Sequence, residues 1–424
     1  MVTSASRISS APSTSQHPSG SSRYDAVIVG ARVAGAATAM LLARRGLRVL
    51  VVDRDGLGSD TLSSHALMRG AVTQLERWGI APALRAASPA IEQVTFHYRD
   101  GAESSATDLP VTTRGASPLL APRRTLLDQT LVEAGVDAGA EFRHRTRVID
   151  INQHPSGHVT GLRIADEAGR ETDITADIVI GADGLRSTVA RRLDVPITRQ
   201  GTEASAFVLR YVEDLDGFAT NAYQWLYGPG ISAGFIPTND GRFCVFAGMT
   251  RQRFATEIRS DVAAGFQRVL DEIHPEFGEA IRRSTPVSRA RAWPGVVGQF
   301  RQAAGPGWAL VGDAGYFKDP SAAHGISDAL RDAELLADAV AAGGTSAERR
   351  DHLAAYGETR DRLATPLFDV LERIASYRWT IDELPAIHLE LGKTMSVEQK
   401  QLAELRSMRG LDADAPDARL QLAA

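Results

Sequence analysis

Short apolar runs alternate with an Ala-rich stretch near the start of the chain. Residues 26–29 form an apolar run that ends at Gly30, the Ala-rich stretch continues to about Arg45, and residues 48–52 form a second apolar run after Gly46. Runs of this length are typical of buried strands, and a glycine just beyond a helical stretch is a stop signal. The pattern therefore predicts one strand–helix–strand unit.

The remaining pattern predicts helix-rich parts on either side of a strand-rich middle. The predicted strands cover 91–99, 147–151, 158–164, 177–180 and four apolar runs within 204–291, and the predicted helices cover 119–140, 261–273 and most of 349–405. A short buried strand that begins at Trp308 leads through Gly312 and Asp313 and a turn with Pro320 into a helix that opens near Gly325.

The composition suits a chain with a sizeable core and argues against several protein classes. The 424 residues are 43% hydrophobic and 23% charged, which is enough for two domains and an appendage. The net charge of −5 gives no sign of nucleic-acid binding. No apolar run approaches the roughly 18–20 residues of a membrane helix, and the histidines and Cys244 show no metal-ligand spacing. A hydrolase elbow of the Gly-x-Ser-x-Gly type is also missing after every predicted strand.

The N-terminus and the single cysteine bear on the cellular compartment of the protein. Residues 1–22 are Ser-rich and lack the apolar core of a signal peptide, so we expect a disordered tail. Cys244 lies in an apolar run, and we expect it to be a small buried residue. No disulfide can form within a chain that has one cysteine, which fits a cytoplasmic protein.

The first candidate binding residues lie in the turn that follows residues 26–29. This turn reads Gly30-Ala31-Arg32-Val33-Ala34-Gly35, and Asp53 follows Gly30 by 23 positions. A glycine-bearing turn between strand and helix places phosphates at a helix N-terminus, and a carboxylate at the second strand end binds the adenosine ribose. We therefore assign dinucleotide binding to Gly30, Arg32, Val33, Ala34, Gly35, Asp53 and the adjacent Arg54, with an ordinary turn as the alternative.

Arg32 stands where the dinucleotide fingerprint has its second glycine. Two interpretations remain open. The guanidinium pairs with the diphosphate, which we favour because an unpaired cation opposes the helix dipole. Alternatively, Arg32 fills a tolerated turn position with its side chain directed away.

Two later strand ends also carry a carboxylate. The strand over 177–180 ends in Gly-Ala-Asp-Gly, where Asp183 is a candidate cofactor ligand or simply a helix cap. Gly312 and Asp313 stand between the strand at Trp308 and the helix near Gly325. A carboxylate accepts hydrogen bonds from sugar-chain hydroxyls, and a helix N-terminus stabilises an anion. Together with the first turn, these motifs predict a flavin dinucleotide.

In this order and at this spacing, the three motifs resemble those of FAD-dependent monooxygenases of the para-hydroxybenzoate hydroxylase fold. Geranylgeranyl reductases and flavin-dependent halogenases are related to this family. The resemblance covers about 23–340 and is strongest at Gly312, Asp313, Pro320 and Gly325. It implies an α/β fold with a Rossmann-type FAD-binding domain, an inserted, mainly antiparallel β-sheet substrate domain, and C-terminal helices.

The resemblance also implies roles for single residues. Asp313 would bind the ribityl chain, Pro320 would lie beside the flavin ring, and Gly325 and Ile326 would offer backbone N–H groups to the flavin N1–C2=O edge. Ser327 stands where the family usually has Asn.

Two arginines are further cofactor candidates by the same resemblance. Arg124 would contact a phosphate or the ribityl chain, and Arg69 would contact the pyrophosphate. The alternative for each is a surface arginine, since most arginines lie at the surface.

No catalytic side chain stands out, but three residues are candidates for the surroundings of the flavin. These are Pro320, His65, for which a buried structural histidine is the alternative, and Lys318, for which an exposed turn lysine is the alternative. Candidates for the wall of an apolar substrate pocket are Trp225, Tyr227 and Phe235, which alternate along two predicted strands and are otherwise plain core.

The predicted domains are discontinuous. The predicted divisions are a tail over 1–22, an FAD-binding domain over 23–90, 116–203 and 296–345, a substrate-binding sheet domain over 91–115 and 204–295, and a helical region over 346–424.

The resemblance implies an FAD-dependent monooxygenase. NAD(P)H would reduce FAD, dioxygen would add at the flavin C4a, and the hydroperoxide would transfer oxygen to an aromatic or other electron-rich small molecule. A flavin-dependent dehydrogenase or reductase is the first alternative, and a non-catalytic flavoprotein is the second. The halogenase alternative is weak because no Trp-x-Trp-x-Ile-Pro string occurs and no lysine precedes Lys318. We expect a monomer or homodimer, and no substrate can be named.

Overall fold

The computed structural model describes residues 23–101, 103–112 and 116–409. The tail predicted over 1–22 and the end of the predicted helical region, 410–424, lie outside the described residues. The helices of the described residues are α1 (Val33–Ala43), α2 (Arg69–Arg77), α3 (Ala81–Ala87), α4 (Arg124–Asp137), α5 (Thr188–Arg192), α6 (Arg251–Arg253), α7 (Val262–Ile273), α8 (Pro275–Arg283), α9 (Gly325–Ala341), α10 (Ser346–Ala375) and α11 (Leu384–Met408). Short helical turns are η2 (Asn239–Gly241), η3 (Phe254–Ile258), η4 (Gly312–Ala314) and η5 (Pro320–Ala322).

The first sheet has a parallel centre. Its strands run in the order β17-β18-β8-β1-β2-β5, and β7 and β6 continue from β8 as antiparallel neighbours. Strands β18, β8, β1, β2 and β5 are mutually parallel. The bounds are β1 (Arg23–Val29), β2 (Val49–Val52), β5 (Glu141–Arg143), β6 (Arg147–Gln153), β7 (Val159–Ala165), β8 (Glu171–Gly181), β17 (Ala304–Gly305) and β18 (Trp308–Leu310).

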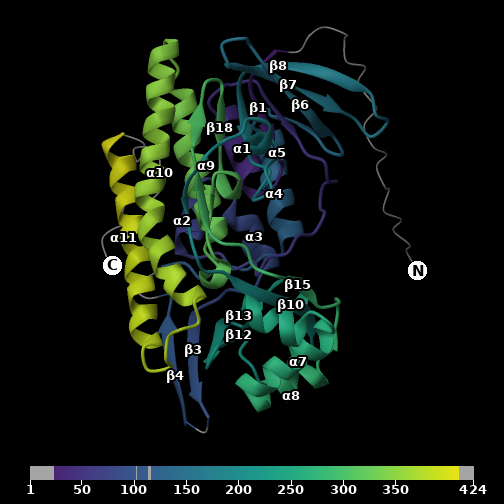
Figure 1. Cartoon of the computed structure of the whole chain (residues 1–424), viewed down its shortest axis with the longest axis vertical. Coiled ribbons are helices and arrows are strands. Elements are labelled where there is room, and N and C mark those ends of the chain that lie inside the picture. Colours follow the sequence, from purple (N-terminus) through teal and green to yellow (C-terminus); the bar gives the residue numbers. More distant parts are fainter. Residues whose placement is uncertain (1–22, 102, 113–115, 410–424) are drawn as a thin grey trace, which may run out of the picture.

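The second sheet is mainly antiparallel and lies below the first in Figure 1. Its order is β14-β10-β13-β12-β11-β3-β4, with β15 also paired to β10. Only the β3–β11 pairing is parallel among these neighbours. The bounds are β3 (Gln93–Asp100), β4 (Glu103–Pro110), β10 (Ser205–Glu213), β11 (Ala222–Gly228), β12 (Ile231–Pro237), β13 (Phe243–Thr250), β14 (Thr285–Pro286) and β15 (Arg291–Trp293), and β9 (Ile197–Gln200), β16 (Gln299–Arg301) and β19 (Tyr316–Phe317) form a small third sheet.

The strand–helix–strand unit predicted from the first apolar runs is confirmed as β1, α1 and β2. Helix α1 is Ala-rich and buried over most of its length, so small side chains let it pack closely on the sheet. Gly35 is required for this packing, because a Cβ there would lie 1.8 Å from the Gly30 carbonyl oxygen. Helix α9 packs on α1 and extends the same apolar core.

The helix predicted over 119–140 begins later than expected, at Arg124. Leu119 and Leu120 instead form isolated bridges with Ile91 and Leu67. Pro122 also disfavours helical backbone at the residue before it. The prediction was therefore wrong for the first five positions.

The predicted C-terminal helices α10 and α11 run side by side along one flank of the molecule (Figure 1). Thr345 and Glu348 form a capping box that fixes the start of α10. The α/β fold class predicted from the sequence is confirmed. Among the described residues, no helix combines the length and the apolarity that a membrane crossing requires.

Candidate cofactor site

Four parallel strands end side by side at one edge of the first sheet, in the order β18-β8-β1-β2. Asp313, Asp183, Gly30 and Asp53 each follow one of these strands, so they lie along the same edge. Neighbouring strands are about 4.8 Å apart, which separates the ends of β18 and β2 by roughly 14 Å. An edge of this length suits an extended ligand.

Glycines let the turns at this edge touch one another. A Cβ at Gly30 would lie 2.5 Å from the Ala182 carbonyl oxygen, and a Cβ at Gly312 would lie 2.8 Å from the Ala34 side chain. The φ angles of the two glycines are 107° and 60°, a region that other residues rarely adopt. The turns after β1, β8 and β18 therefore form one continuous surface at the start of α1.

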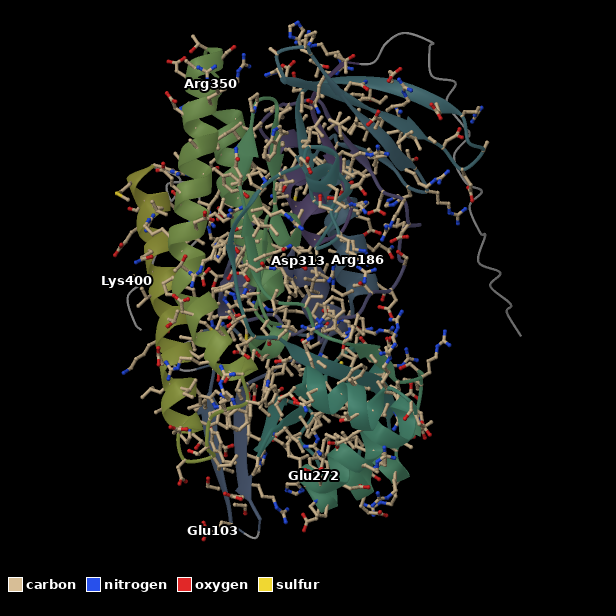
Figure 2. All side chains as sticks on the ribbon, in the orientation of Figure 1. Glu103, Arg186, Glu272, Asp313, Arg350 and Lys400 are labelled. Carbon is tan, nitrogen blue, oxygen red and sulfur yellow. The ribbon has the colours of Figure 1, made fainter. Side chains whose placement is uncertain are left out.

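Asp313 lies near the middle of the molecule (Figure 2). Its residue is exposed, and its carboxylate has no hydrogen bond within residues 23–101, 103–112 and 116–409. Protein nevertheless surrounds it, because burial raises the pKa of Asp313, while the nearby charges of Lys318 and Arg124 oppose that rise. A carboxylate that solvent reaches but protein desolvates lines a recess rather than a convex surface.

The start of α9 is open beside this recess. Gly325 and Pro320 are both exposed, and a Cβ at Gly325 would meet nothing within 4 Å. Ile326 is buried, so its side chain anchors the first turn while the backbone N–H groups of that turn remain without intrahelical partners. These groups and the helix dipole favour a negatively charged partner.

Asp53 braces the turn at the other end of the edge. Its two oxygens accept hydrogen bonds from the Ala31 N–H at 2.6 Å and from the Asp55 N–H at 2.8 Å. The neighbouring Arg54 is exposed, and its guanidinium lies 4.0 Å from the Asp55 carboxylate. Each carboxylate oxygen can accept a second hydrogen bond, so Asp53 still has capacity for a ribose hydroxyl.

Two arginines converge on Asp128 of α4. Arg124 donates to both Asp128 oxygens at 3.0 and 3.1 Å. Arg32 contacts Asp128 and Asp55 at 3.4 Å each and the Ser59 carbonyl at 3.2 Å. Contacts of 3.4 Å exceed the usual hydrogen-bond range, so the Arg32 guanidinium is held loosely at the start of α1.

Asp183 has the capping role that was the alternative interpretation. Its Oδ2 accepts from the Thr188 N–H at 2.5 Å and the Val189 N–H at 3.4 Å, which fixes the start of α5. Its Oδ1 is buried and has no partner among the described residues. Burial raises the pKa of Asp183, against hydrogen bonds from Ser187 and Thr188 that lower it. An unpartnered buried oxygen at this edge can still serve a ligand.

Arg69 and His65 are both held inside the protein. Arg69 donates to the main-chain carbonyls of Val111 and Ser117, so its visible role is to hold these two residues. His65 is fully buried at a positive φ of 64°, and its Nε2 contacts the Tyr211 hydroxyl on β10. Burial first, and then Arg124 and Arg123, hold the pKa of His65 well below its usual value. His65 is therefore a neutral, strained histidine, and strain of this kind is common near functional sites.

The three predicted wall residues lie on both faces of the second sheet. Trp225 pairs with Gly234, but Phe235 pairs with Gln224 and so points to the opposite face, where it packs on Phe277. The prediction of a common wall that includes Phe235 is therefore wrong, because a shift of one residue along a strand moves the side chain to the opposite face of the sheet. Trp225 contacts the Phe246 ring, which lies over Gly234, whereas the ring of Tyr227 packs at a tilt on His388 of α11, with 4.6 Å between the ring centres.

Comparison with known proteins identifies the family to which this chain belongs. Residues 23–370 match the model of a family described as FAD binding domain. The chain belongs to the FAD binding domain family. The match includes every strand end described above, and it makes the protein an FAD-dependent oxidoreductase.

Several relatives match most of the chain. A digeranylgeranylglycerophospholipid reductase of Methanothrix thermoacetophila is 26% identical over 77% of this chain and 81% of its own. A menaquinone reductase of Mycolicibacterium smegmatis is 26% identical over 83% of this chain and 84% of its own. An uncharacterized protein of Mycobacterium tuberculosis is 30% identical over 75% of this chain and 85% of its own.

Solved structures share the fold at lower identity. The flavin-dependent brominase Bmp2 superposes with a TM-score of 0.74 and 19% identity over 91% of this chain and all of its own. PqsL of Pseudomonas aeruginosa, described as a probable FAD-dependent monooxygenase, gives a TM-score of 0.69 and 22% identity over 88% of this chain and all of its own.

The residues present fit FAD. The edge offers an accessible, unpaired carboxylate at Asp313, an open helix start at Gly325, a loosely held cation at Arg32, a second cation at Arg124 that is paired with Asp128, and acceptor capacity at Asp53. These are the partners that a ribityl chain, a diphosphate and an adenosine ribose require. Asp313, Arg32, Arg124 and Asp53 would hold FAD, which supplies redox chemistry that no side chain provides.

Replacing Arg32 tests the two interpretations of the altered fingerprint in this chain. If the guanidinium passes from Asp55 and Asp128 to the FAD diphosphate, Arg32→Ala should weaken FAD binding about 10- to 150-fold, the range of a charge-assisted contact. The loss should be larger at low ionic strength, where screening is weakest. Titration of FAD into apo protein at two salt concentrations measures it.

Arg170→Ala, an exposed arginine paired with Asp166, is the matched control and should not change affinity. Unchanged affinity in Arg32→Ala at both salts would show that Arg32 only ties the loop at Ser59 to α1.

Sequence reasoning missed the residues that brace the site from behind. The Tyr356 hydroxyl of α10 donates to the Leu310 carbonyl at the end of β18, and Arg360 donates to the Arg301 carbonyl beneath the Gly315 turn. Tyr211 was missed because nothing in the sequence joins β10 to His65. Asp128 had a usable signal, since it follows Arg124 by four residues on one helix.

Proposed function

We propose that this FAD-dependent oxidoreductase is a monooxygenase that uses NAD(P)H and dioxygen to hydroxylate an aromatic or other electron-rich small molecule. The observation that carries the proposal is the apolar core that the start of α9 shares with the second sheet. Ile326 and Ala322 belong to one continuous apolar cluster with Trp225 and Phe246. A substrate beside the flavin would thus meet an apolar, aromatic wall that excludes water.

Each residue of the site has a task that serves this function. Asp313 orients the ribityl chain, and the first turn of α9 favours negative charge on the adjoining ring edge. Trp225 and Phe246 exclude water and position a planar substrate. His65 is neutral and in contact with Tyr211, so it contributes shape and a hydrogen bond rather than charge. No side-chain nucleophile is required, because the cofactor carries the redox step.

A flavin-dependent reductase is the second candidate. Two of the relatives reported above are reductases, of a digeranylgeranylglycerophospholipid and of menaquinone. The fold does not choose between the candidates, since halogenases and a probable monooxygenase share it.

Isotope labelling separates the candidates. Purified protein with FAD and NAD(P)H is screened against candidate aromatics under ¹⁸O₂, and we expect substrate-stimulated NAD(P)H oxidation with one ¹⁸O atom in the product. Product formation without oxygen, with two added hydrogens, would replace the monooxygenase by the reductase. Failure of NAD(P)H to bleach the bound flavin with every substrate tried would favour a non-catalytic flavoprotein.

A further inference from the structure

Lys318 is a buried lysine immediately behind the start of α9. Only 4% of its side chain is exposed, and its Nζ forms an ion pair with Asp328 in the first turn of α9. The alternative of an exposed turn lysine is therefore wrong. Nζ also lies 5.2 Å from the centre of the Tyr316 ring, but no hydrogen bond from Nζ is found among the described residues, although an ammonium has three donors. This lysine is poorly satisfied as a cation.

A fully buried arginine organises the carboxylates around Lys318. Arg331 of α9 contacts Asp328 at 3.0 Å, Asp332 at 2.7 Å and Glu398 at 2.5 Å. Glu398 comes from α11, so the C-terminal helix completes the cluster. Burial opposes the Arg331 charge, but Asp332 and Glu398 raise the pKa of Arg331 above its usual value. Arg331 is therefore a permanent cation.

The cluster has more negative than positive charge. Its carboxylates are Asp328, Asp332 and Glu398, and its cations are Arg331 and, when protonated, Lys318. Asp332 Oδ2 and Glu398 Oε2 are buried and without hydrogen-bond partners in the described chain. An excess of buried negative charge calls for a proton or another cation.

His324 does not supply the missing charge. It lies 3.2 Å from Asp328 and 3.6 Å from Glu398, but burial first, then Lys318 and Arg331, hold the pKa of His324 well below its usual value. His324, Asp328 and Glu398 lie close enough together for a metal ion, yet Lys318 and Arg331 already pair with these carboxylates. The variable charge is therefore that of Lys318.

Lys318 is poised between its two charge states. Burial, and after it the Arg331 cation, lower the pKa of Lys318 to about 7, while Glu398, Asp313 and Asp332 oppose the fall. Added negative charge at the start of α9 would raise the pKa of Lys318, because an opposite charge favours the ammonium.

We propose that Lys318 is a redox-linked proton carrier, which takes up one proton when the cofactor beside α9 is reduced and releases it on reoxidation. Hydride transfer from a reduced nicotinamide delivers two electrons and one proton and thus adds one negative charge beside α9. The neutral Lys318 amine then takes one proton from solvent and becomes an ammonium. When the two electrons leave, that ammonium returns its proton. The inference rests on FAD binding but not on hydroxylation.

The midpoint potential of the bound flavin tests the proposal. Potentials are measured without oxygen or substrate between pH 6 and 9, and a tenfold change in proton activity shifts a two-electron couple by about 30 mV per proton. Wild-type protein should show about 30 mV per pH unit below pH 7 and about 59 mV per pH unit above it. Lys318→Met should keep about 30 mV per pH unit throughout.

Lys400→Met is the matched control, because Lys400 is exposed on α11 and lies at the outer edge of the molecule (Figure 2). This variant should keep the wild-type break, that is, the change of slope of midpoint potential against pH near pH 7. Glu398→Gln removes a carboxylate that favours the ammonium, so its break should move below pH 7. Visible spectra of the reduced protein at each pH separate titration of the cofactor from that of Lys318.

A constant slope of about 30 mV in wild-type protein would overturn the proposal, and so would a break that persists in Lys318→Met. If Lys318→Met does not fold, the Glu398→Gln profile decides, and an unmoved break there contradicts the proposal. A protein that is not a monooxygenase still gives these potentials. Failure to bind FAD would instead contradict the cofactor assignment.

Discussion

Asp313→Ala should lower the affinity for FAD about 10- to 150-fold. The carboxylate is accessible, and none of the described residues donates a hydrogen bond to it, so it is available to ribityl hydroxyls. A hydrogen bond to a charged group contributes about 1.5–3 kcal/mol, which corresponds to that range. Titration of FAD into apo protein, followed by quenching of flavin fluorescence, measures the dissociation constant.

The stability of the apo protein should hardly change in this variant. Asp313 has no internal hydrogen bond to lose, and its raised pKa shows that folding disfavours its charge. Asp216→Ala, an exposed carboxylate on the loop after β10, is the matched control and should leave both quantities unchanged. If Asp313→Ala binds FAD as tightly as wild-type protein, the ribityl chain does not lie at this strand end.

Arg331→Met should destabilise the apo protein by about 3–5 kcal/mol at pH 7, the cost of breaking a buried ion pair. Methionine keeps an unbranched stem at this position but leaves Asp328, Asp332 and Glu398 without their shared cation. Urea unfolding followed by circular dichroism measures the free energy of unfolding.

A lower pH should partly restore the stability of Arg331→Met. Without Arg331, burial raises the pKa values of the carboxyls in the folded state above those in the unfolded state. The folded state then binds more protons, so the unfolding free energy of the variant rises as the pH falls from 7 to 5.

Arg373→Met is the control, because its pair with Glu390 is half exposed and should contribute at most about 1 kcal/mol. If Arg331→Met does not fold at all, Arg331→Lys keeps the charge and should retain a measurable part of the stability. A loss below about 1 kcal/mol in Arg331→Met would show that the cluster is solvated and would remove the basis for a poised Lys318.

The sequence alone determined the parts of this protein that local patterns encode. The strand–helix–strand unit, the order of the three strand-end motifs and the helix at Gly325 depend on hydrophobic period and glycine position, which act over a few residues. Because parallel strands share one carboxyl edge, Gly30, Asp53 and Asp313 could be grouped once these strands were recognised.

Only the tertiary structure decided how distant segments meet. The register of β11 and β12 placed Trp225 and Phe235 on opposite faces, although both fit the same alternating pattern. Lys318 is buried because Glu398, 80 positions later in the chain, closes a cluster around Arg331 through α11. Such contacts depend on which faces of which elements pack together, and the free energy of that packing is not contained in any local stretch of sequence.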